Sequence, residues 1–366
     1  MLSCAAAADG YSDFNAGVSA EVRDEPTALQ YLSSAISATD LPAHLKPLAY
    51  LLRGRVYANQ NKFDESIRDF TTAIDLKPDY ALAYVDRCRV YWAKKDYPQA
   101  IADCGSAKKL QPDNWRLGDL LARIYLETKQ YPDAIANIST FIARRPAADG
   151  LLLLNRAEYY RKDGQFEKAL ADANAAHQAE PTWFSPESEL GFIYFSQKDF
   201  QNAVASFAAM SDLSKKDATA LLLKGEAQLA MGQYSDATES FEDALGQVPL
   251  AGFGMLWLTI AKAKESEQPL PRYLEPFKKV NYPNWPGPLV ALYLGKSSPE
   301  DVLKLHGTTE DAGEEVQCGT DFFIGEWYAM HGNAADGKRL LQEVATSCAS
   351  DDNIRILAGV ELGRMP

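Results

Sequence analysis

Apolar and small residues recur along this chain with a period of about 34 residues. The segment 47–80 shows the pattern clearly: two apolar stripes with helical spacing, separated by a short polar turn and closed by a proline. Each stripe has the length of an amphipathic helix, so the unit predicts two helices joined by a turn. The same pattern then returns five times up to residue 251.

Several positions of the unit keep the same register throughout. The small residue of the first helix is Gly54, Cys88, Ala122, Ala157, Gly191 and Gly225. An aromatic follows three residues later as Tyr57, Tyr91, Tyr125, Tyr160 and Tyr194, and Gln228 replaces it once. The aromatic at the turn is Phe63, Tyr97, Tyr131, Phe166, Phe200 and Tyr234. Small residues allow two helices to approach closely, and aromatic rings fill the space between successive hairpins.

This pattern resembles the tetratricopeptide repeat (TPR), from about residue 9 to 251 and again from 318 to 351. The resemblance implies an all-α fold, a right-handed superhelical solenoid of helix-turn-helix repeats, here with an irregular C-terminal helical cap. A solenoid lengthens by stacking, so the chain is expected to form one array. The resemblance specifies the fold and implies a protein-binding function without naming a partner.

The chain divides into five expected segments. Residues 1–8 have small residues before Asp9 like the remnant of a secretion signal, with a disordered tail as the alternative. Residues 9–46 form a divergent N-terminal repeat and linker, and residues 47–251 form six regular TPR units. Residues 252–317 form an irregular Pro-rich helical segment. Residues 318–366 form a TPR-like hairpin and a capping helix, which is expected to cover the open end of the array.

The irregular segment also contains recognisable helix signals. A short helix is expected near 273–280 and another over Leu289–Leu294, followed by a helix capped by Ser298 with Pro299 at its first position. A Gly-rich and acidic loop, 306–315, then leads to the last hairpin.

The C-terminal third carries a second, more particular resemblance. Its marks are W-L-x-x-A at Trp257–Ala261, W-P-x-P-x-x-x-x-Y-L-G-K at Trp285–Lys296 and F-x-I-G-E-W-Y at Phe322–Tyr328. This order is similar to the NlpI-like family of periplasmic and outer-membrane lipoproteins. That resemblance implies an adaptor that brings murein hydrolases together with a tail-specific protease, and a homodimer. A lipid anchor at Cys4 stays open.

The bulk composition excludes some classes of function. Apolar residues make up 46% and charged residues 24%, as in a folded protein, and no apolar run is long enough to cross a membrane. The formal net charge of −13 repels phosphate backbones and anionic lipid. Nucleic acid is therefore not expected as a partner.

No catalytic or metal-binding motif is present. The four histidines, His44, His177, His306 and His331, are scattered, and no phosphate-binding loop or nucleophile elbow occurs. The chain is therefore expected to be no enzyme and to carry no cofactor and no metal.

One row of residues differs from the general pattern of core positions. The position after the first-helix small residue is expected to face the groove, and it is occupied by Arg55, Arg89, Arg123, Glu158, Phe192 and Glu226. Three guanidinium groups on neighbouring helices suit a carboxylate, because each can donate two parallel hydrogen bonds. Trp92 adds an apolar anchor one turn from Arg89. The alternative is that Asp86 and Asp119 neutralise these arginines as solvated ion pairs.

Four cysteines fall in pairs by the repeat register. Cys88 and Cys104 face each other across one hairpin, and Cys318 and Cys348 lie at the start of one helix and the end of its partner. Both pairs can reach the Cα separation of a disulfide, about 4.4–6.8 Å. We expect a bridge between Cys318 and Cys348, and we favour the reduced, buried form for the other pair.

These features together predict a non-enzymatic adaptor or scaffold of the bacterial envelope, periplasmic or secreted, that holds an acidic or C-terminal peptide of its partner near the arginines. A regulatory subunit of an envelope enzyme, acting through residues 266–316, is the first alternative. A cytosolic co-chaperone is the second, although Leu51 and Arg55 do not match the Lys and Asn of its carboxylate clamp.

Overall fold

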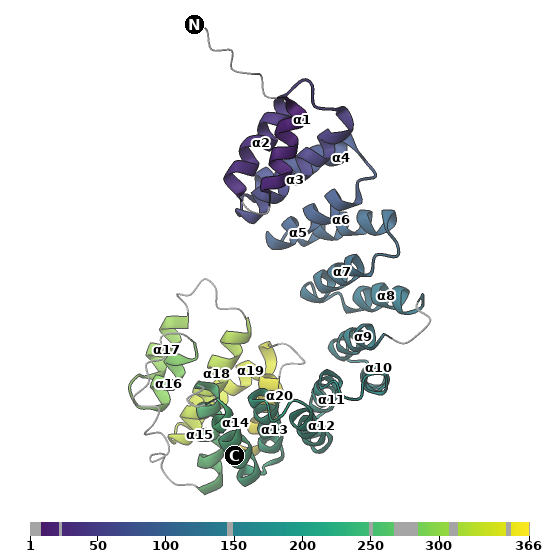
Figure 1. Ribbon diagram of the computed structural model, residues 1–366. Coiled ribbons are helices and arrows are strands. Elements are labelled where there is room, and N and C mark those ends of the chain that lie inside the picture. Colours follow the sequence, from purple (N-terminus) through teal and green to yellow (C-terminus); the bar gives the residue numbers. More distant parts are fainter. Residues whose placement is uncertain are drawn as a thin grey trace. The chain divides into compact units, whose positions relative to one another are not determined.

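The computed structural model describes residues 9–21, 24–144, 149–248, 252–266, 285–306, 314–348 and 353–365. In these ranges every regular element is a helix, and successive helices pair as hairpins (Figure 1), so the prediction of an all-α TPR fold is confirmed. The predicted signal remnant at 1–8, the helix near 273–280 and residues 307–313 of the predicted loop 306–315 lie outside the described residues.

The chain forms two compact units, Met1–Arg145 and Pro146–Pro366. Within the first unit each helix packs against the next one along the chain. Its helices are α1 (Gly10–Ala20), α2 (Glu25–Ser37), the 3-10 helix η1 (Ala43–Leu45), α3 (Lys46–Asn59), α4 (Phe63–Leu76), α5 (Ala81–Ala93), α6 (Tyr97–Leu110), α7 (Trp115–Glu127) and α8 (Tyr131–Ile142).

The second unit begins with three more hairpins of the same kind and continues into the irregular C-terminal helices. The hairpins are α9 (Gly150–Lys162) with α10 (Phe166–Ala179), α11 (Ser185–Ser196) with α12 (Phe200–Leu213), and α13 (Ala218–Met231) with α14 (Tyr234–Gln247). The remaining helices are α15 (Gly252–Ser266), α16 (Gly287–Tyr293), α17 (Pro299–His306), α18 (Glu314–Met330), α19 (Ala334–Ser347) and α20 (Asn353–Arg364).

In the hairpins α3–α4, α11–α12 and α13–α14 the two helices meet where an aromatic ring covers a residue without a side chain. A Cβ added to Gly54 of α3 would lie 2.6 Å from the ring of Phe70 on α4, and Phe70 is fully buried. Gly191 and Gly225 receive the rings of Phe207 and Phe241 in the same way. The small first-helix position therefore marks the closest approach of the helices, as the sequence pattern predicts.

A second repeated contact was not predicted. One position before the small residue, Arg53 and Arg87 each make a two-pronged ion pair with an Asp sixteen residues later, on the second helix of the same hairpin. Asp69 and Asp103 are nearly buried, and the N–O distances are 2.7 and 2.8 Å in both pairs. Paired guanidinium and carboxylate groups satisfy each other's hydrogen bonds when both leave water.

The next hairpins show that the two partners change together. Arg156 and Asp172 keep the ion pair in α9 and α10. Where Leu121 replaces the arginine, Asn137 replaces the aspartate, and its Nδ2 donates a hydrogen bond of 2.6 Å to the carbonyl oxygen of Gly118. A neutral amide avoids leaving a charge buried without a partner.

Both cysteine pairs are bonded. Cys318 and Cys348 join the start of the α18–α19 hairpin to its end, with a Cα separation of 6.0 Å, so the predicted bridge is confirmed. The interpretation of Cys88 and Cys104 as a reduced pair is wrong, because their sulfurs are 2.07 Å apart and their Cα atoms 5.5 Å apart. The small-residue site brings the helices close enough for a bridge as well as for apolar packing.

The C-terminal helices do not simply extend the array. The predicted helices after Trp285 and Ser298 are present as α16 and α17, and Ser298 accepts a hydrogen bond from the backbone of Asp301. The last helix, α20, packs against α18 and α19 and also reaches α11 and α13 (Figure 1). It therefore turns back onto the first helices of earlier repeats. The sequence had predicted that it would cover the open end of the array, so its position differs from that prediction.

Buried charges hold α20 in this position. Lys264 of α15 lies 2.5 Å from Glu361 of α20 and 3.0 Å from Glu326 of α18. Arg364 pairs with Glu361 at 2.6 Å and donates to the carbonyl oxygens of Leu229 and Ala230 at the end of α13. Cations at a helix C-terminus also suit the partial negative charge there. The cluster thus joins α13, α15, α18 and α20.

In this cluster, burial disfavours the charged form of Glu326 more than its cationic neighbours stabilise it. It is fully buried, and neither carboxyl oxygen receives a well-aligned hydrogen bond even though Lys264 lies at ion-pair distance. Burial raises the pKa of Glu326 to about 7, and Lys264 opposes this by favouring the charged form. Glu361 adds to the increase, Arg364 opposes it, and the buried Tyr293 of α16 is the further titratable group that faces Glu326.

We predict that replacing Gly54 by Ala destabilises the first unit. The added methyl group meets the buried Phe70 ring, and overpacking of this kind costs about 1–3 kcal/mol. Gly105→Ala on α6 is the matched control, since its added Cβ has nothing within 4 Å and should stabilise the helix by about 0.5–1 kcal/mol. Urea unfolding followed by circular dichroism measures both, and an equal effect of the two variants would contradict the contact.

We also predict that Glu326 makes stability depend on pH. Its folded-state pKa lies above its ordinary value of 4.5, so its contribution is complete below 4.5 and is lost as the pH rises through about 7. Lys264, whose two carboxylate partners raise its pKa, stays charged throughout this window. As the pH rises from 4.5 to about 7, the free energy of unfolding of the wild type should therefore fall relative to that of Glu326→Gln, by at most about 1.4 kcal/mol per pH unit.

The measurement is a set of urea unfolding curves between pH 4.5 and 8. Glu343→Gln on α19 is the matched control, because Glu343 is exposed and pairs only with Arg339 of its own helix in the described contacts. Its curves should run parallel to those of the wild type. If the Glu326→Gln curves are also parallel to the wild type, Glu326 does not titrate in this range.

Candidate functional site

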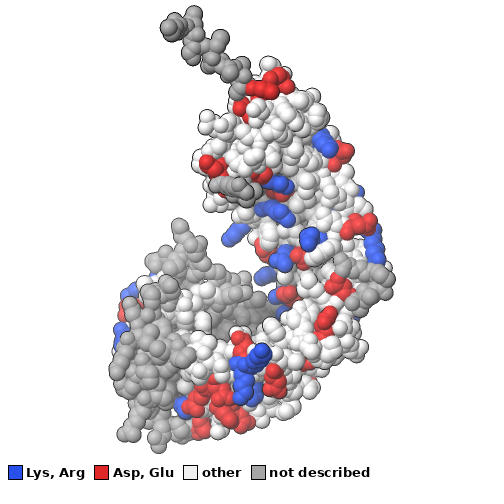
Figure 2. Space-filling view, viewed as in Figure 1, with Lys and Arg blue, Asp and Glu red and all other residues white. Residues whose placement is uncertain are grey.

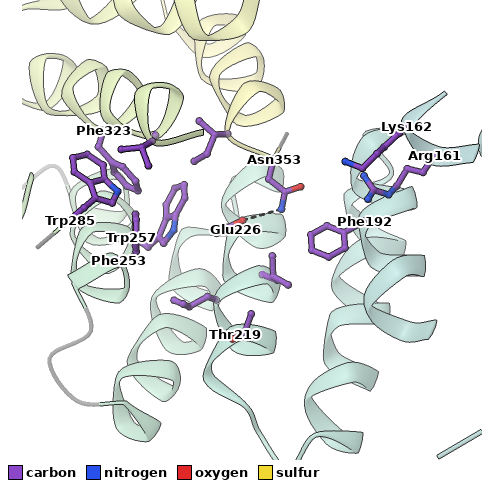
Figure 3. Close-up of a pocket in the computed structure, with 15 residues that line it drawn as sticks. Arg161, Lys162, Phe192, Thr219, Glu226, Phe253, Trp257, Trp285, Phe323 and Asn353 are labelled. Carbon is purple, nitrogen blue, oxygen red and sulfur yellow. Dashed lines mark hydrogen bonds between the residues drawn. The ribbon is translucent and has the colours of Figure 1, made fainter. Parts of the chain in front are cut away.

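A groove of the second unit lies between the first helices of its repeats and the C-terminal helices. Its volume is about 760 Å³, and Figure 3 shows its walls facing each other across open space. The described residues that line it are Arg161, Lys162, Phe192, Thr219, Leu222, Leu223, Glu226, Phe253, Trp257, Trp285, Val316, Gly319, Phe323, Asn353 and Ile354. They lie on α9, α11, α13, α15, α18 and α20, except Trp285, which comes just before α16.

One wall of the groove is aromatic. Trp257 of α15 lies 4.9 Å from the ring of Phe323 on α18, in an edge-to-face contact, and stacks on Phe241 of α14. Phe253, one turn before Trp257, keeps 38% of its surface exposed and lies 6.2 Å from Phe323. Trp257 and Phe323 are buried, so the solvent-open part of this apolar wall is Phe253 together with the half-buried Trp285, which lies beside these rings in Figure 3.

The opposite end of the groove carries two basic residues. Arg161 and Lys162 are in the last turn of α9, and Phe192 of α11 lies next to them (Figure 3). The Arg161 guanidinium stacks over the Phe192 ring at 5.5 Å and pairs with the buried Glu189 at 2.8 Å. Burial raises the pKa of Glu189, and Arg161 opposes that increase. Arg161 is thus held in place by an internal partner.

The start of α20 lines the middle of the groove. Asn353, at the start of α20, donates a hydrogen bond of 3.2 Å to Glu226 on α13, drawn as a dashed line in Figure 3. Ile354 and the nearby Leu222 and Leu223 add apolar surface. The groove therefore exists because α20 returns to α13, and the buried cluster around Lys264 and Glu361 keeps it there.

The predicted arginine row lies on three helices of the first unit. Arg55 on α3 is 2.5 Å from Asp86 on α5, and Arg89 is 3.8 Å from the same carboxylate. Arg123 on α7 is 3.0 Å from Asp119. The ion pairs that the sequence analysis offered as the alternative are therefore present, while Arg89 and Arg123 still expose 62% and 61% of their side chains.

Trp92 and the surrounding acids complete this region. The Trp92 indole donates a hydrogen bond of 2.8 Å to Glu127. Burial raises the pKa of Glu21, and the nearby Arg55 opposes that increase. Figure 2 shows Lys and Arg interleaved with Asp and Glu over this unit. The row is thus a mixed-charge surface, and its role in binding stays a prediction.

The predicted residues of the second unit are divided by the structure. Phe192 and Glu226 line the groove, while Glu158 is a half-buried neighbour whose charge acts on Glu189. Sequence reasoning missed the aromatic wall, the cations at the end of α9 and the contribution of α20. The available signal was weak: Trp285 in a Pro-rich stretch and a glycine, Gly319, inside an apolar helix.

Two further findings concern only the described part of the chain. No helix there has the length and apolar character needed to cross a membrane. No group of three or more His, Cys, Asp or Glu side chains among those residues has the arrangement of a metal site.

One solved structure similar to this chain agrees with the fold. The crystal structure of a tetratricopeptide repeat protein from Parabacteroides merdae ATCC 43184 has a TM-score of 0.50 at 15% identity, over 69% of this chain and 99% of that one. PilW, titled a widely conserved type IV pilus biogenesis factor, has a TM-score of 0.47 at 18% identity, over 58% of this chain and 98% of that one. At 15% identity the likeness to the Parabacteroides merdae protein concerns the fold alone.

Human Superkiller complex protein 3 is 32% identical over 115 residues, which is 30% of this chain. The chain spans only 7% of that relative's length. The resemblance to the NlpI-like lipoproteins stays a prediction.

Models of the repeat itself match the chain directly. One model described as tetratricopeptide repeat matches residues 51–114 and 120–182, and a second with the same description matches residues 194–251. Together these ranges cover half of the sequence and coincide with the hairpins from α3 to α14. The chain therefore belongs to the tetratricopeptide repeat family.

Proposed function

We propose that this protein is a non-enzymatic adaptor that binds a segment of a partner protein in the groove of its second unit. The observation that carries the proposal is the groove itself, which is open, about 760 Å³ in volume, and combines a rigid aromatic wall with charged and polar groups. Grooves of this composition bind by burying apolar side chains and use a few polar groups for orientation. TPR proteins bind protein or peptide partners, which supports this assignment.

The arginine row of the first unit is proposed as an additional contact. Arg89 and Arg123 are exposed, and their partners Asp86 and Asp119 leave some of their N–H donors available to a ligand carboxylate. The compensation by these aspartates makes the expected contribution small, as for other exposed ion pairs. The row would therefore orient a partner more than hold it.

We further propose that the protein works in the bacterial envelope, in the periplasm or outside the cell. Two disulfides support this proposal, because such bonds persist in oxidising compartments and are rare in the cytosol. They also argue against the cytosolic co-chaperone alternative. The finer assignments, an adaptor for murein hydrolases and a protease, a regulatory subunit of an envelope enzyme, and a homodimer, rest on the NlpI-like resemblance.

Affinity capture from envelope extract, followed by binding of each purified captured protein to the full chain, tests this function. A saturable, direct partner is expected, and Arg89→Ala with Arg123→Ala should weaken it about three- to tenfold with an unchanged melting temperature. Arg68→Ala on α4 is the matched control, since Arg68 is an exposed arginine outside the row. If no captured protein binds directly, the adaptor function is wrong; if the double variant binds as the wild type does, the row is not a contact.

The proposed compartment predicts the state of the cysteines in the native protein. Protein isolated from the periplasm and denatured without reductant should show no reactive thiol from Cys88, Cys104, Cys318 or Cys348. Mass spectrometry after alkylation identifies the labelled positions. Four labelled cysteines would contradict both bridges and the oxidising compartment together. Closing loops of these lengths stabilises the folded chain by about 3–4 kcal/mol per bridge, so added reductant should lower the melting temperature.

A further inference from the structure

The helix α20 is held against α13 and α15 by charged groups. Arg364 donates hydrogen bonds of 3.1 and 2.7 Å to the carbonyl oxygens of Leu229 and Ala230, at the end of α13. About one turn earlier on α20, Glu361 accepts a hydrogen bond of 2.5 Å from Lys264 of α15. Both contacts involve an ion, so the docking of α20 depends on the charge balance in this part of the second unit.

Glu326 of α18 lies beside these contacts, and its surroundings favour its neutral form. The side chain is fully buried. Lys264 lies 3.0 Å away, but neither carboxyl oxygen of Glu326 receives a well-aligned hydrogen bond, and the same ammonium group also pairs with Glu361. A buried carboxylate without aligned donors is costly, whereas the protonated carboxyl group carries no charge and costs much less.

The helix α20 forms part of the cover over this carboxyl group. Burial is the main cause that raises the pKa of Glu326 to about 7, and Lys264 opposes it. Two charges of α20 act on the same group, because Glu361 adds to the increase and Arg364 opposes it. When α20 moves away, both charges leave and water reaches Glu326. The pKa of Glu326 in this open form therefore returns toward its ordinary value of 4.5.

The other helices that pack against α18 bring further charged or titratable groups. Burial raises the pKa of Tyr293 on α16, so its phenol stays neutral in the range considered. On α17 Glu300 accepts a hydrogen bond from Tyr328, and on α19 Arg339 pairs with acids of its own helix. The balance at Glu326 is therefore set mainly by burial and by the cluster around Lys264.

The rest of the second unit does not need α20 to move with it. The bridge between Cys318 and Cys348 closes the hairpin of α18 and α19 independently of α20. Ile356, Leu357 and Ala358 of α20 are buried in the core and favour the docked form. The open form is therefore a minor state that α20 reaches by local opening, while α18 and α19 stay paired.

We propose that the docking of α20 on the second unit depends on pH, being tightest while Glu326 is protonated and weaker once Glu326 has lost its proton. The docked form binds this proton more strongly than the open form, so protons stabilise docking. The stabilisation is complete below pH 4.5 and is lost as the pH rises through about 7. Because Asn353 and Ile354 line the groove, opening of α20 also removes part of the groove wall.

Native-state hydrogen exchange of the full, disulfide-bonded chain, read by mass spectrometry between pH 5 and 8, tests this inference. Dividing each observed rate by the intrinsic rate at the same pH gives the opening constant of each helix. Peptides of α20 should have larger opening constants than those of α18 and α19, and a weaker dependence on low urea concentrations, because local opening exposes less surface. The opening constant of α20 should rise by at most about tenfold per pH unit and level off above about pH 7.

Glu326→Gln is the decisive variant of the protein. The amide has nearly the same size and does not titrate, so the opening constant of α20 should be the same at pH 5 and pH 8. Glu343→Gln on α19 is the matched control, since Glu343 is exposed and its carboxylate pairs with Arg339 of its own helix. It should follow the wild type. Peptides of α3 and α4, in the first unit, check the correction for intrinsic rates.

Each outcome decides one part of the inference. If α20 and α18 have equal opening constants at every pH, α20 opens only when the whole unit unfolds and the inference is wrong. It is also wrong if the opening constant of wild-type α20 does not change with pH, or if the rise persists in Glu326→Gln. The wild-type measurements decide the first two points even if the variant fails to fold. The inference goes beyond the proposed function, and a failure to capture a direct partner leaves these measurements unaffected.

Discussion

The structure depends on one steric constraint, the contact between a ring on one helix and a residue without a side chain on its neighbour. Phe70, Phe207 and Phe241 can pack this closely against α3, α11 and α13 only because Gly54, Gly191 and Gly225 have no Cβ in the way. This contact fixes how deeply and in which rotation the two helices meet. Since the small first-helix position recurs every 34 or 35 residues, the positions just beyond it recur on one face of the successive first helices.

In the second unit, those positions lie on the face of α11 and α13 that α20 contacts. In the second unit, α20 returns to α11 and α13 instead of adding another repeat, and it brings Asn353 and Ile354 to the face that carries Phe192 and Glu226. Burying Lys264, Glu326 and Glu361 to hold this arrangement is costly, because each charge leaves water. An apolar cluster of the same volume would bind α20 at lower cost but with less definite register. The charges therefore suit a helix whose position determines the shape of a groove.

The sequence predicted what is local and repeated. The hairpins, the small contacts and the Cys318–Cys348 bridge follow from spacing along the chain, because residues 34 apart occupy equivalent places. The ion pairs of Arg53 with Asp69 and of Arg87 with Asp103 were not predicted, because the two partners come together only when both helices of the hairpin are packed. The groove could not be predicted at all. Its shape depends on contacts between α13 and α20, whose residues lie more than a hundred positions apart, and the repeat period gives no information on such contacts.

The two charged surfaces also differ in what they can contribute to binding. In the first unit Arg55 and Arg89 share Asp86, and Arg123 has Asp119, so a ligand carboxylate must compete with carboxylates already in place, in a region where water screens the interaction. In the second unit Arg161 is paired, but the surface beside it is apolar and aromatic, and binding there releases water from both partners. In both places acidic residues of the protein already neutralise the cations. We therefore expect the affinity for a partner to come from the aromatic wall and the selectivity from the cations.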